Sequence, residues 1–447
     1  MAGAMLLALP VGWNTVAWAG DARAMTTGKA LDRPSRTYLH DVLRETFDSI
    51  TYLVHPQTGL PYDSSHRPRH TSITNLGLYL AAVAVGQRMG LVEREDALAR
   101  ISSALDSLER IQRWHGFPVS WVDVETLATI EGEQFSTADH LGNLIASLLV
   151  VRQAVPEVAD RITAYLQPME WGYLYDEETG WLKGGYNVYA GDFTIDQPWG
   201  KWYYAFLGAD TRTYSFLAIG SGHVPIRHWQ ILLRDTEERY GFHYLVPGWQ
   251  GGGLFMQYLP GIFIRERKTE AGRSARQFAL AQMEHGRRLT LPVWGWSACV
   301  SPTGEYLGWG RITDAVVTPH ASALAALDDP RQALSNFRAL EALGARRPLL
   351  LDGAGRVWIP GFCGCDQRTA GGPGVAARSR HDLPGAGQRG PSRHRLEAVP
   401  ARCDGAVGLD ASSKNRNPYR GVQRTGTVTP TGYRARFPGI QQTEDRS

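Results

Sequence analysis

The stretch Phe135–Leu149, with the sequence FSTADHLGNLIASLL, decides the fold class of this chain. Its apolar side chains recur at three- and four-residue spacings, which is the period of an α-helix that buries one face. The residues on that apolar stripe are Leu141, Leu144, Ile145, Leu148 and Leu149. The pattern therefore predicts a core helix that begins close to Asp139.

The chain on both sides of this stretch alternates helical periods with polar loops. Three helices are predicted before it. The first covers residues 34–53, the second runs from a cap at Thr71 or Ser72 to Gly90, and the third follows it. The apolar face of that third segment consists of Leu98, Ile101, Leu105, Leu108 and Ile111. After it, two helices are predicted within residues 203–235. Further helices fit 274–288, 320–327 and 330–343.

Strand signals are confined to short pieces near residues 180–190 and 242–247, so the predicted fold class is all-α. A chain of this length must bury many amphipathic helices, and a ring of paired helices is one economical way to do so. A solenoid of stacked helices is the alternative, but no fixed-period repeat favours it.

The composition fits a packed domain and excludes several classes of function. Of 447 residues, 43% are hydrophobic and 14 are tryptophans, which suit both a core and stacking platforms. Residues 361–447 hold 14 Lys and Arg against 7 Asp and Glu, so the preceding residues carry a net charge of −4. This body offers no basic stripe for nucleic acid. Only Cys299 of four cysteines lies in it, so neither a disulfide framework nor a zinc-ligand spacing can be built from the cysteines. No His/Cys metal cluster is found in the sequence, and no metal or cofactor is predicted.

The two ends of the chain differ in character from the body. Residues 1–30 are predicted to be a signal segment and linker, because an apolar run ends in small residues. This favours a periplasmic or secreted protein, with a cytoplasmic location as the alternative; no other run is long enough for an integral membrane span. Residues 363–447 form a basic tail rich in Gly, Pro and Arg, which is predicted to be disordered. A frameshift near Phe362 is one hypothesis for this change in composition.

Several further motifs follow one another along residues 45–362. They are TSITNLGLYLAAVAVGQRMGL at 71–91, WYYAFLGADTRTYSFLAIGSGHVPIRHW at 202–229, GWQGGGLFMQYLP at 248–260, LPVWGWSACVSPTGEYLGWG at 291–310 and VVTPHASALAALDDPRQALSNFRALEALG at 316–344. Together with the stretch quoted first, they resemble the glucoamylase-like domain family. That family includes a domain of cyclic β-1,2-glucan synthases and is related to β-1,2-glucanases. Residues 31–362 are accordingly identified as a glucoamylase-like domain.

This resemblance implies an (α/α)6 toroid, in which six inner and six outer helices surround an acidic cleft. If a frameshift has removed the last helices, the toroid is incomplete at its C-terminal end. The resemblance also implies a glycoside hydrolase or transglycosylase that acts on a glucan-like carbohydrate through paired carboxylates. A non-catalytic carbohydrate-binding protein of the same fold is the alternative. The oligomeric state is left open.

Hydrolysis of a glycosidic bond needs a carboxylic acid that protonates the leaving oxygen and a second carboxylate that activates water or attacks the sugar. Asp210, in the motif ADTR, is the first candidate, because an acid in an apolar stretch must be paired or face a cleft. An ion pair with Arg212 is its structural alternative. Asp139 and Asp196 compete for the second role, although Asp139 could simply cap its helix and Asp196 could be a solvated loop residue.

Five residues are predicted to bind the sugar: Arg212, Trp249, Trp294, His320 and Asp63. Trp249 lies beside three consecutive glycines, which let a backbone approach a ligand closely. Trp294 can stack on a sugar ring or plug the core. His320 can bond a sugar hydroxyl or satisfy a structural partner.

One position departs from the family pattern. Many relatives have Glu directly after the Phe of the 248–260 motif, whereas Phe255 is followed here by Met256 and Gln257. If that Glu is needed for catalysis elsewhere, this chain is inactive or uses another acid. The departure favours the binding-protein alternative.

Overall fold

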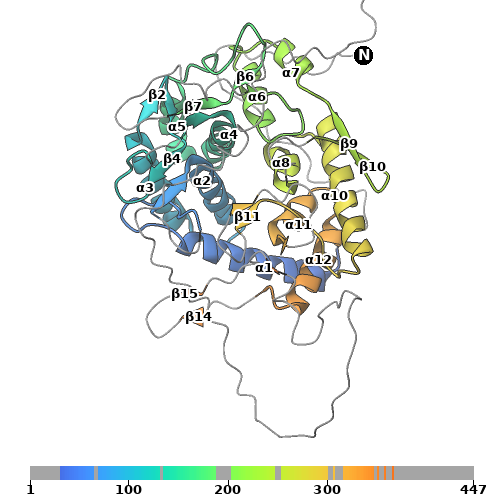
Figure 1. The fold of residues 1–447 in the computed structure, drawn as a ribbon. Helices are drawn as coiled ribbons and strands as arrows, with labels where there is room; N and C mark the ends of the chain where they lie inside the picture. Colours follow the sequence, from blue (N-terminus) through green and yellow to red (C-terminus); the bar gives the residue numbers. More distant parts are fainter. Residues whose placement is uncertain are drawn as a thin grey trace, which may run out of the picture. The chain divides into compact units, whose positions relative to one another are not determined.

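The computed structural model describes residues 31–64, 69–130, 134–187, 203–246, 253–300 and 316–346, together with short strands at 306–307, 350–351, 357–358 and 365–366. The chain divides into two units, residues 1–377 and 378–447, and all described residues lie in the first. The described part of that unit is mostly helical, as predicted (Figure 1).

Four long helices begin the unit: α1 (Arg33–Tyr52), α2 (Ile73–Arg88), α3 (Arg94–Arg110) and α4 (Ala138–Ala154). Two of them start at side-chain caps. The Asp32 carboxylate accepts the Ser35 N–H at 2.9 Å, and the Ser72 hydroxyl accepts the Asn75 N–H at 3.2 Å. The predicted cap at Ser72 is therefore confirmed, and the helix predicted over 34–53 corresponds to α1.

Helix α4 packs between α2 and α6 (Arg212–Gly220), and two glycines set how closely these helices approach. A Cβ atom at Gly77 would come within 2.8 Å of Leu144 Cα, and one at Gly142 within 2.7 Å of the Tyr214 amide nitrogen. Each contact joins the first two turns of one helix to the first two turns of its neighbour. The N-terminal ends of α2, α4 and α6 therefore lie close to one another.

The remaining helices are mostly shorter. They are η2 (Pro156–Val158), α5 (Ala159–Leu166), α7 (Arg227–Ile231), α8 (Leu254–Tyr258), α9 (Pro260–Phe263), α10 (Glu270–Arg288), α11 (Pro319–Ala325) and α12 (Pro330–Ala342). Helix α6 contacts α9, α8 contacts α9, α10 and α11, and α11 contacts α12. The helices predicted over 274–288, 320–327 and 330–343 correspond to α10, α11 and α12.

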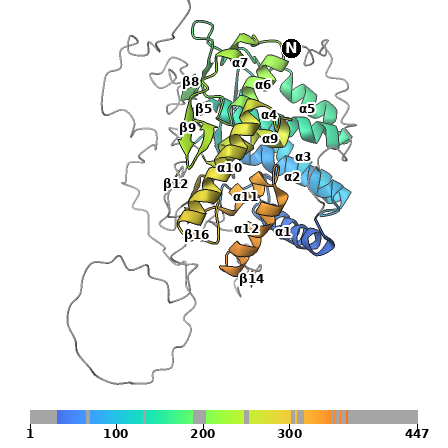
Figure 2. The ribbon, with the colours of Figure 1, turned by 90° about the vertical axis from the view of Figure 1, so that its right-hand side faces the viewer.

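Helix α12 and the turn that follows it lie against α1 (Figure 2). The Arg346 guanidinium donates to both oxygens of the Glu45 carboxylate, at 2.6 and 2.8 Å, and Arg338 donates to the Ser35 hydroxyl at 3.3 Å. Both guanidinium groups also lie over the Tyr38 ring, 5.2 and 5.5 Å from its centroid. Since α1 also contacts α2, the order of neighbours α1, α2, α4, α6, α9, α8, α11, α12 returns to its start.

Two large apolar clusters fill this arrangement, and a third, small cluster consists of Leu207, Leu232, Leu245 and Ala271. The larger one includes the buried faces of α2, α3 and α4, and the smaller one lies among α8, α10, α11 and α12 around Phe278 and Trp296. Among the described residues, no single helix is long and apolar enough to cross a membrane. The bent pair Ala138–Ala154 and Pro156–Leu166 meets the requirement together, by length and composition only.

The described strands form two-stranded antiparallel pairs. The pairs are β1 (His70–Ser72) with β4 (Trp121–Asp123), β2 (Arg113–Trp114) with β3 (Phe117–Pro118), β5 (Gln134–Thr137) with β7 (Gly185–Asn187), β6 (Leu182–Lys183) with β8 (Tyr203–Tyr204), β9 (Thr236–Arg239) with β10 (Phe242–Leu245), β11 (Cys299–Val300) with β12 (Tyr306–Leu307), β13 (Val316–Val317) with β16 (Cys365–Asp366), and β14 (Leu350–Leu351) with β15 (Val357–Trp358). Strands do occur near 180–190 and 242–247, as predicted. The prediction that strands occur only there was wrong, because further strands lie elsewhere along the chain. Most pairs are two to four residues long, too short for an alternating pattern to appear in the sequence.

Candidate functional site

The candidate site lies where α2, α4 and α6 begin. Strand β1 leads directly into α2, and β5 leads directly into α4. The starts of α2 and α4 are therefore each fixed by a strand pair. Asp139 is the second residue of α4, and Asp210 lies two residues before α6. Because the first turns of these two helices pack against each other, the fold brings the two predicted acids to the same place.

Asp210 is a buried carboxyl group, with 5% of its surface exposed. Burial raises its pKa, and the negative charge on Asp139 raises it further, to about 7. The Arg212 charge and a hydrogen bond from the Asn143 side chain oppose this increase without cancelling it. Asp210 therefore holds its proton up to roughly neutral pH.

Asp139 has a more open environment than Asp210. Its side chain is half-buried, and one carboxylate oxygen accepts the His140 backbone N–H at 2.8 Å. Its charge acts on Asp210, so the two carboxyl groups form an interacting pair. Two acids that differ in burial are suited to different chemical roles.

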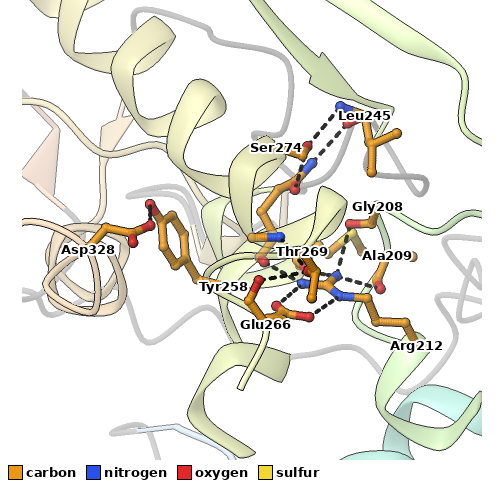
Figure 3. A network of polar contacts seen from close by, with 12 residues as sticks. Gly208, Ala209, Arg212, Leu245, Tyr258, Glu266, Thr269, Ser274 and Asp328 are labelled. Carbon is orange, nitrogen blue, oxygen red and sulfur yellow. Dashed lines mark hydrogen bonds and ion pairs between the residues drawn. The ribbon is translucent and has the colours of Figure 1, made fainter. Parts of the chain in front are cut away.

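Arg212 is engaged entirely with other protein groups (Figure 3). Its guanidinium forms a two-point ion pair with Glu266, with Nε at 2.9 Å and Nη2 at 2.6 Å from the carboxylate oxygens. The other N–H groups donate to the carbonyls of Ala209, Met256 and Gln257 at 2.8, 3.0 and 2.6 Å. The side chain is fully buried, so the predicted sugar contact is corrected: Arg212 is a structural residue that braces α6.

The two residues that follow Phe255, where the family resemblance led us to expect an acid, are structural as well. Gln257 is fully buried; its amide donates to the Leu245 carbonyl at 2.9 Å and accepts from the Ser274 hydroxyl at 3.1 Å. Met256 is 8% exposed and packs in the interior. Neither side chain supplies an acid.

Trp294 belongs to the core. It is 7% exposed within the smaller apolar cluster, and its backbone N–H and C=O both bond the Asn336 side chain, at 2.9 and 2.8 Å. The prediction of a stacking platform is therefore corrected to the core-plug alternative. Trp249 and Asp196 lie outside the described residues.

His320 is the second residue of α11, and its imidazole is exposed. The surrounding protein nevertheless lowers its pKa to about 4 by desolvation. A neutral imidazole of this kind can both donate to and accept from a sugar hydroxyl.

Asp63 lies beside the start of α2. It accepts a hydrogen bond from the Asn75 side chain at 2.7 Å, and its second oxygen is 3.8 Å from His70 Nε2. His70 in turn contacts Trp121, and Trp121 contacts His140, the residue after Asp139. The structure therefore connects Asp63 to the acid pair through aromatic side chains, of which His70 and Trp121 were not predicted as site residues. Within the described part of the chain, no group of three His, Cys, Asp or Glu side chains could hold a metal ion.

The resemblance to glucoamylase-like proteins is confirmed. Residues 49–206 match a sequence family described as a protein of unknown function (DUF3131). A glucoamylase-like protein from Bacteroides uniformis ATCC 8492 superposes with a TM-score of 0.61 at 17% identity, covering 77% of this chain and 90% of that one. The endo-β-1,2-glucanase from Chitinophaga pinensis, solved with sophorotriose and glucose, gives 0.59 at 18% identity, covering 70% and 83%. These structures establish a shared fold.

One relative is similar in sequence. The cyclic β-(1,2)-glucan synthase NdvB of Rhizobium meliloti (strain 1021) is 28% identical over 217 residues. That match covers 45% of this chain but only 7% of the synthase. The matched segment therefore spans only a small part of that much longer protein.

Proposed function

We propose that this chain is a glycoside hydrolase or transglycosylase with an (α/α)6-toroid fold, acting on a glucan through Asp210 and Asp139. The closed order of neighbouring helices supports the toroid. The observation that carries the proposal is the carboxyl pair, in which a buried acid with a pKa near 7 lies beside a more exposed carboxylate.

Asp210 is assigned the role of general acid. It holds a proton near neutral pH and can deliver it to the glycosidic oxygen as the bond to the sugar breaks. Asp139 is assigned the second role, either as the base that activates water or as the nucleophile. The two roles follow from burial, because the buried carboxyl is the one that resists ionisation.

The proposed substrate is a β-1,2-linked glucan. The proposal draws on the names of the similar proteins, a cyclic β-(1,2)-glucan synthase and an endo-β-1,2-glucanase bound to sophorotriose. Asp63 and His320 are proposed to bind sugar hydroxyl groups, since both lie at helix starts with exposed side chains.

A carbohydrate-binding protein without catalysis is the second candidate. One observation favours it: neither Met256 nor Gln257 is the acid that the family resemblance predicts after Phe255, and both are buried in structural contacts. Such a protein would bind glucan and show no turnover.

Release of reducing ends from a panel of β-1,2-, β-1,3- and β-1,4-glucans separates the two candidates. The wild-type chain is compared with Asp210→Asn and with Asp328→Asn, a control at a carboxyl whose side chain is 8% exposed and bonded to Tyr258 and Arg267. We expect release by the wild type, a loss of about 100-fold or more in Asp210→Asn, and little change in the control. Equal activity of Asp210→Asn and wild type would refute the proposed mechanism, whereas glucan binding without any release would support the binding protein.

A further inference from the structure

Three aromatic side chains form a row between Asp63 and the acid pair. The ring centroids of His70 and Trp121 are 5.6 Å apart with an interplanar angle of 71°, and those of Trp121 and His140 are 5.6 Å apart at 65°. His70 faces Asp63, and His140 directly follows Asp139 in α4. The indole of Trp121 therefore contacts the histidine that faces Asp63 and the histidine that follows Asp139.

The backbone holds Trp121 firmly in this row. It lies in β4, opposite Ser72 of β1, and its carbonyl accepts the Ile130 N–H at 3.2 Å. Ser72 is also the cap of α2, so the indole is tied to the start of that helix. Preorganised side chains of this kind lose little conformational freedom on binding a ligand.

The exposure of Trp121 distinguishes it from tryptophans of the core. Trp171, Trp294 and Trp296 are 5%, 7% and 0% exposed, whereas Trp121 and His140 are only half-buried. Half-exposed aromatic rings beside a few polar side chains are typical of the lining of ligand sites.

We propose that Trp121 and His140 form a sugar-binding subsite beside Asp139, with the indole packing against a pyranose ring and the half-exposed His140 ring lining the edge of the subsite. This subsite rests on the proposed function, because it supplies binding for the glucan that the acid pair would cleave. Its position predicts that it strengthens binding of chains long enough to extend from the acid pair toward Asp63.

The test measures binding apart from turnover. A β-1,2-linked glucan oligosaccharide is titrated calorimetrically into Asp210→Asn alone and combined with Trp121→Ala, Trp121→Phe, His140→Ala or Trp229→Ala. Trp229 is the control, since it is half-buried in α7 against a separate apolar cluster of Leu207, Leu232, Leu245 and Ala271. Thermal unfolding of each variant checks that the fold is intact.

We expect Trp121→Ala to weaken binding about tenfold, which corresponds to about 1.4 kcal/mol, with most of the affinity kept in Trp121→Phe and all of it in the Trp229 control. His140→Ala should weaken binding as well. Unchanged affinity in folded Trp121→Ala, or no binding by Asp210→Asn itself, overturns the subsite. If the wild type releases no sugar but the Trp121 effect is present, the hydrolase proposal fails and the subsite stands.

Discussion

Asp210 shows how one residue acquires its chemistry from its surroundings. The sequence singles it out because an acid in an apolar stretch needs a partner or a cleft, and the structure places it beside Asp139. The sequence could not assign Arg212, because its partner Glu266 is 54 residues away and the carbonyls of Met256 and Gln257 come from another helix. An ion pair between distant segments leaves no pattern in the sequence.

The raised pKa of Asp210 predicts a stability that depends on pH. In the folded protein Asp210 holds its proton to about pH 7, whereas an unfolded chain releases it near the ordinary value of 3.8. Between these values the folded state binds more protons, so the free energy of unfolding falls as the pH rises. The asparagine of Asp210→Asn cannot titrate. Between pH 4 and 8 the free energy of unfolding of this variant should therefore fall by about 2 to 4 kcal/mol less than that of the wild type.

Urea unfolding at a series of pH values measures this difference. The comparison between wild type and variant cancels the titration of the other groups that they share. If the free energy of unfolding changed with pH in the same way for the two proteins, burial would not raise the pKa of Asp210.

At the scale of elements, the Arg212–Glu266 pair joins α6 to the segment after α9. Breaking a buried pair by removing one partner leaves an uncompensated charge in the interior. We expect Arg212→Ala to reduce the free energy of unfolding by about 3 to 5 kcal/mol, and Arg212→Lys to restore only part of it, because a lysine cannot make the two-point contact. Denaturant unfolding gives the values.

The control for this prediction is Arg287, whose side chain is 72% exposed in its pair with Glu284. Arg287→Ala should change the free energy of unfolding by less than about 1 kcal/mol. A similar cost for the two arginines would show that Arg212 is not a structural brace.

The contact between α4 and α6 depends on Gly142. A Cβ atom there would lie 2.7 Å from the Tyr214 amide nitrogen, so Gly142→Ala must push two helix backbones apart. We expect a cost of about 1 to 3 kcal/mol in thermal or denaturant unfolding. Gly220 lies at the end of α6, and a Cβ atom on it would have no other atom within 4 Å. Gly220→Ala should therefore be neutral or stabilising.

Elements were predictable where the sequence pattern is long. The periods around Leu141 and over 330–343 gave helices in the right places, because a helix of three or more turns repeats its apolar face several times. The two helices predicted within residues 203–235 correspond to α6 and α7, although the short strand β8 at the start of that range was not predicted. Short strands such as β1 and β4 owe their existence to pairing with each other, which one sequence does not reveal.

At the scale of the whole unit, the contact of α12 with α1 closes the order of neighbouring helices. Tyr38 lies between the two helices, under the guanidinium groups of Arg338 and Arg346. We expect Tyr38→Ala to loosen both helices together, so that amide hydrogen exchange accelerates in α1 and α12 while α4, in the larger core, is unchanged. Acceleration confined to α1 would contradict a closed order.

This closure could not be predicted from spacing. Arg346 and Glu45 are 301 residues apart, and a ring and an open solenoid have the same local helical periods. Only the resemblance to glucoamylase-like proteins predicted a ring. The acid pair could not be predicted from spacing either, because Asp139 and Asp210 come together only through the packing of α4 on α6.

The central claim is that Asp210 donates a proton to a glucan. It is tested most directly by the initial rate of reducing-end release from β-1,2-glucan as a function of pH, for wild type and Asp210→Asn. We predict a wild-type kcat/KM that decreases as the pH rises through about 7, where Asp210 loses its proton, and no measurable release by the variant at any pH. Release by Asp210→Asn at the wild-type rate, with the same pH profile, would contradict the claim.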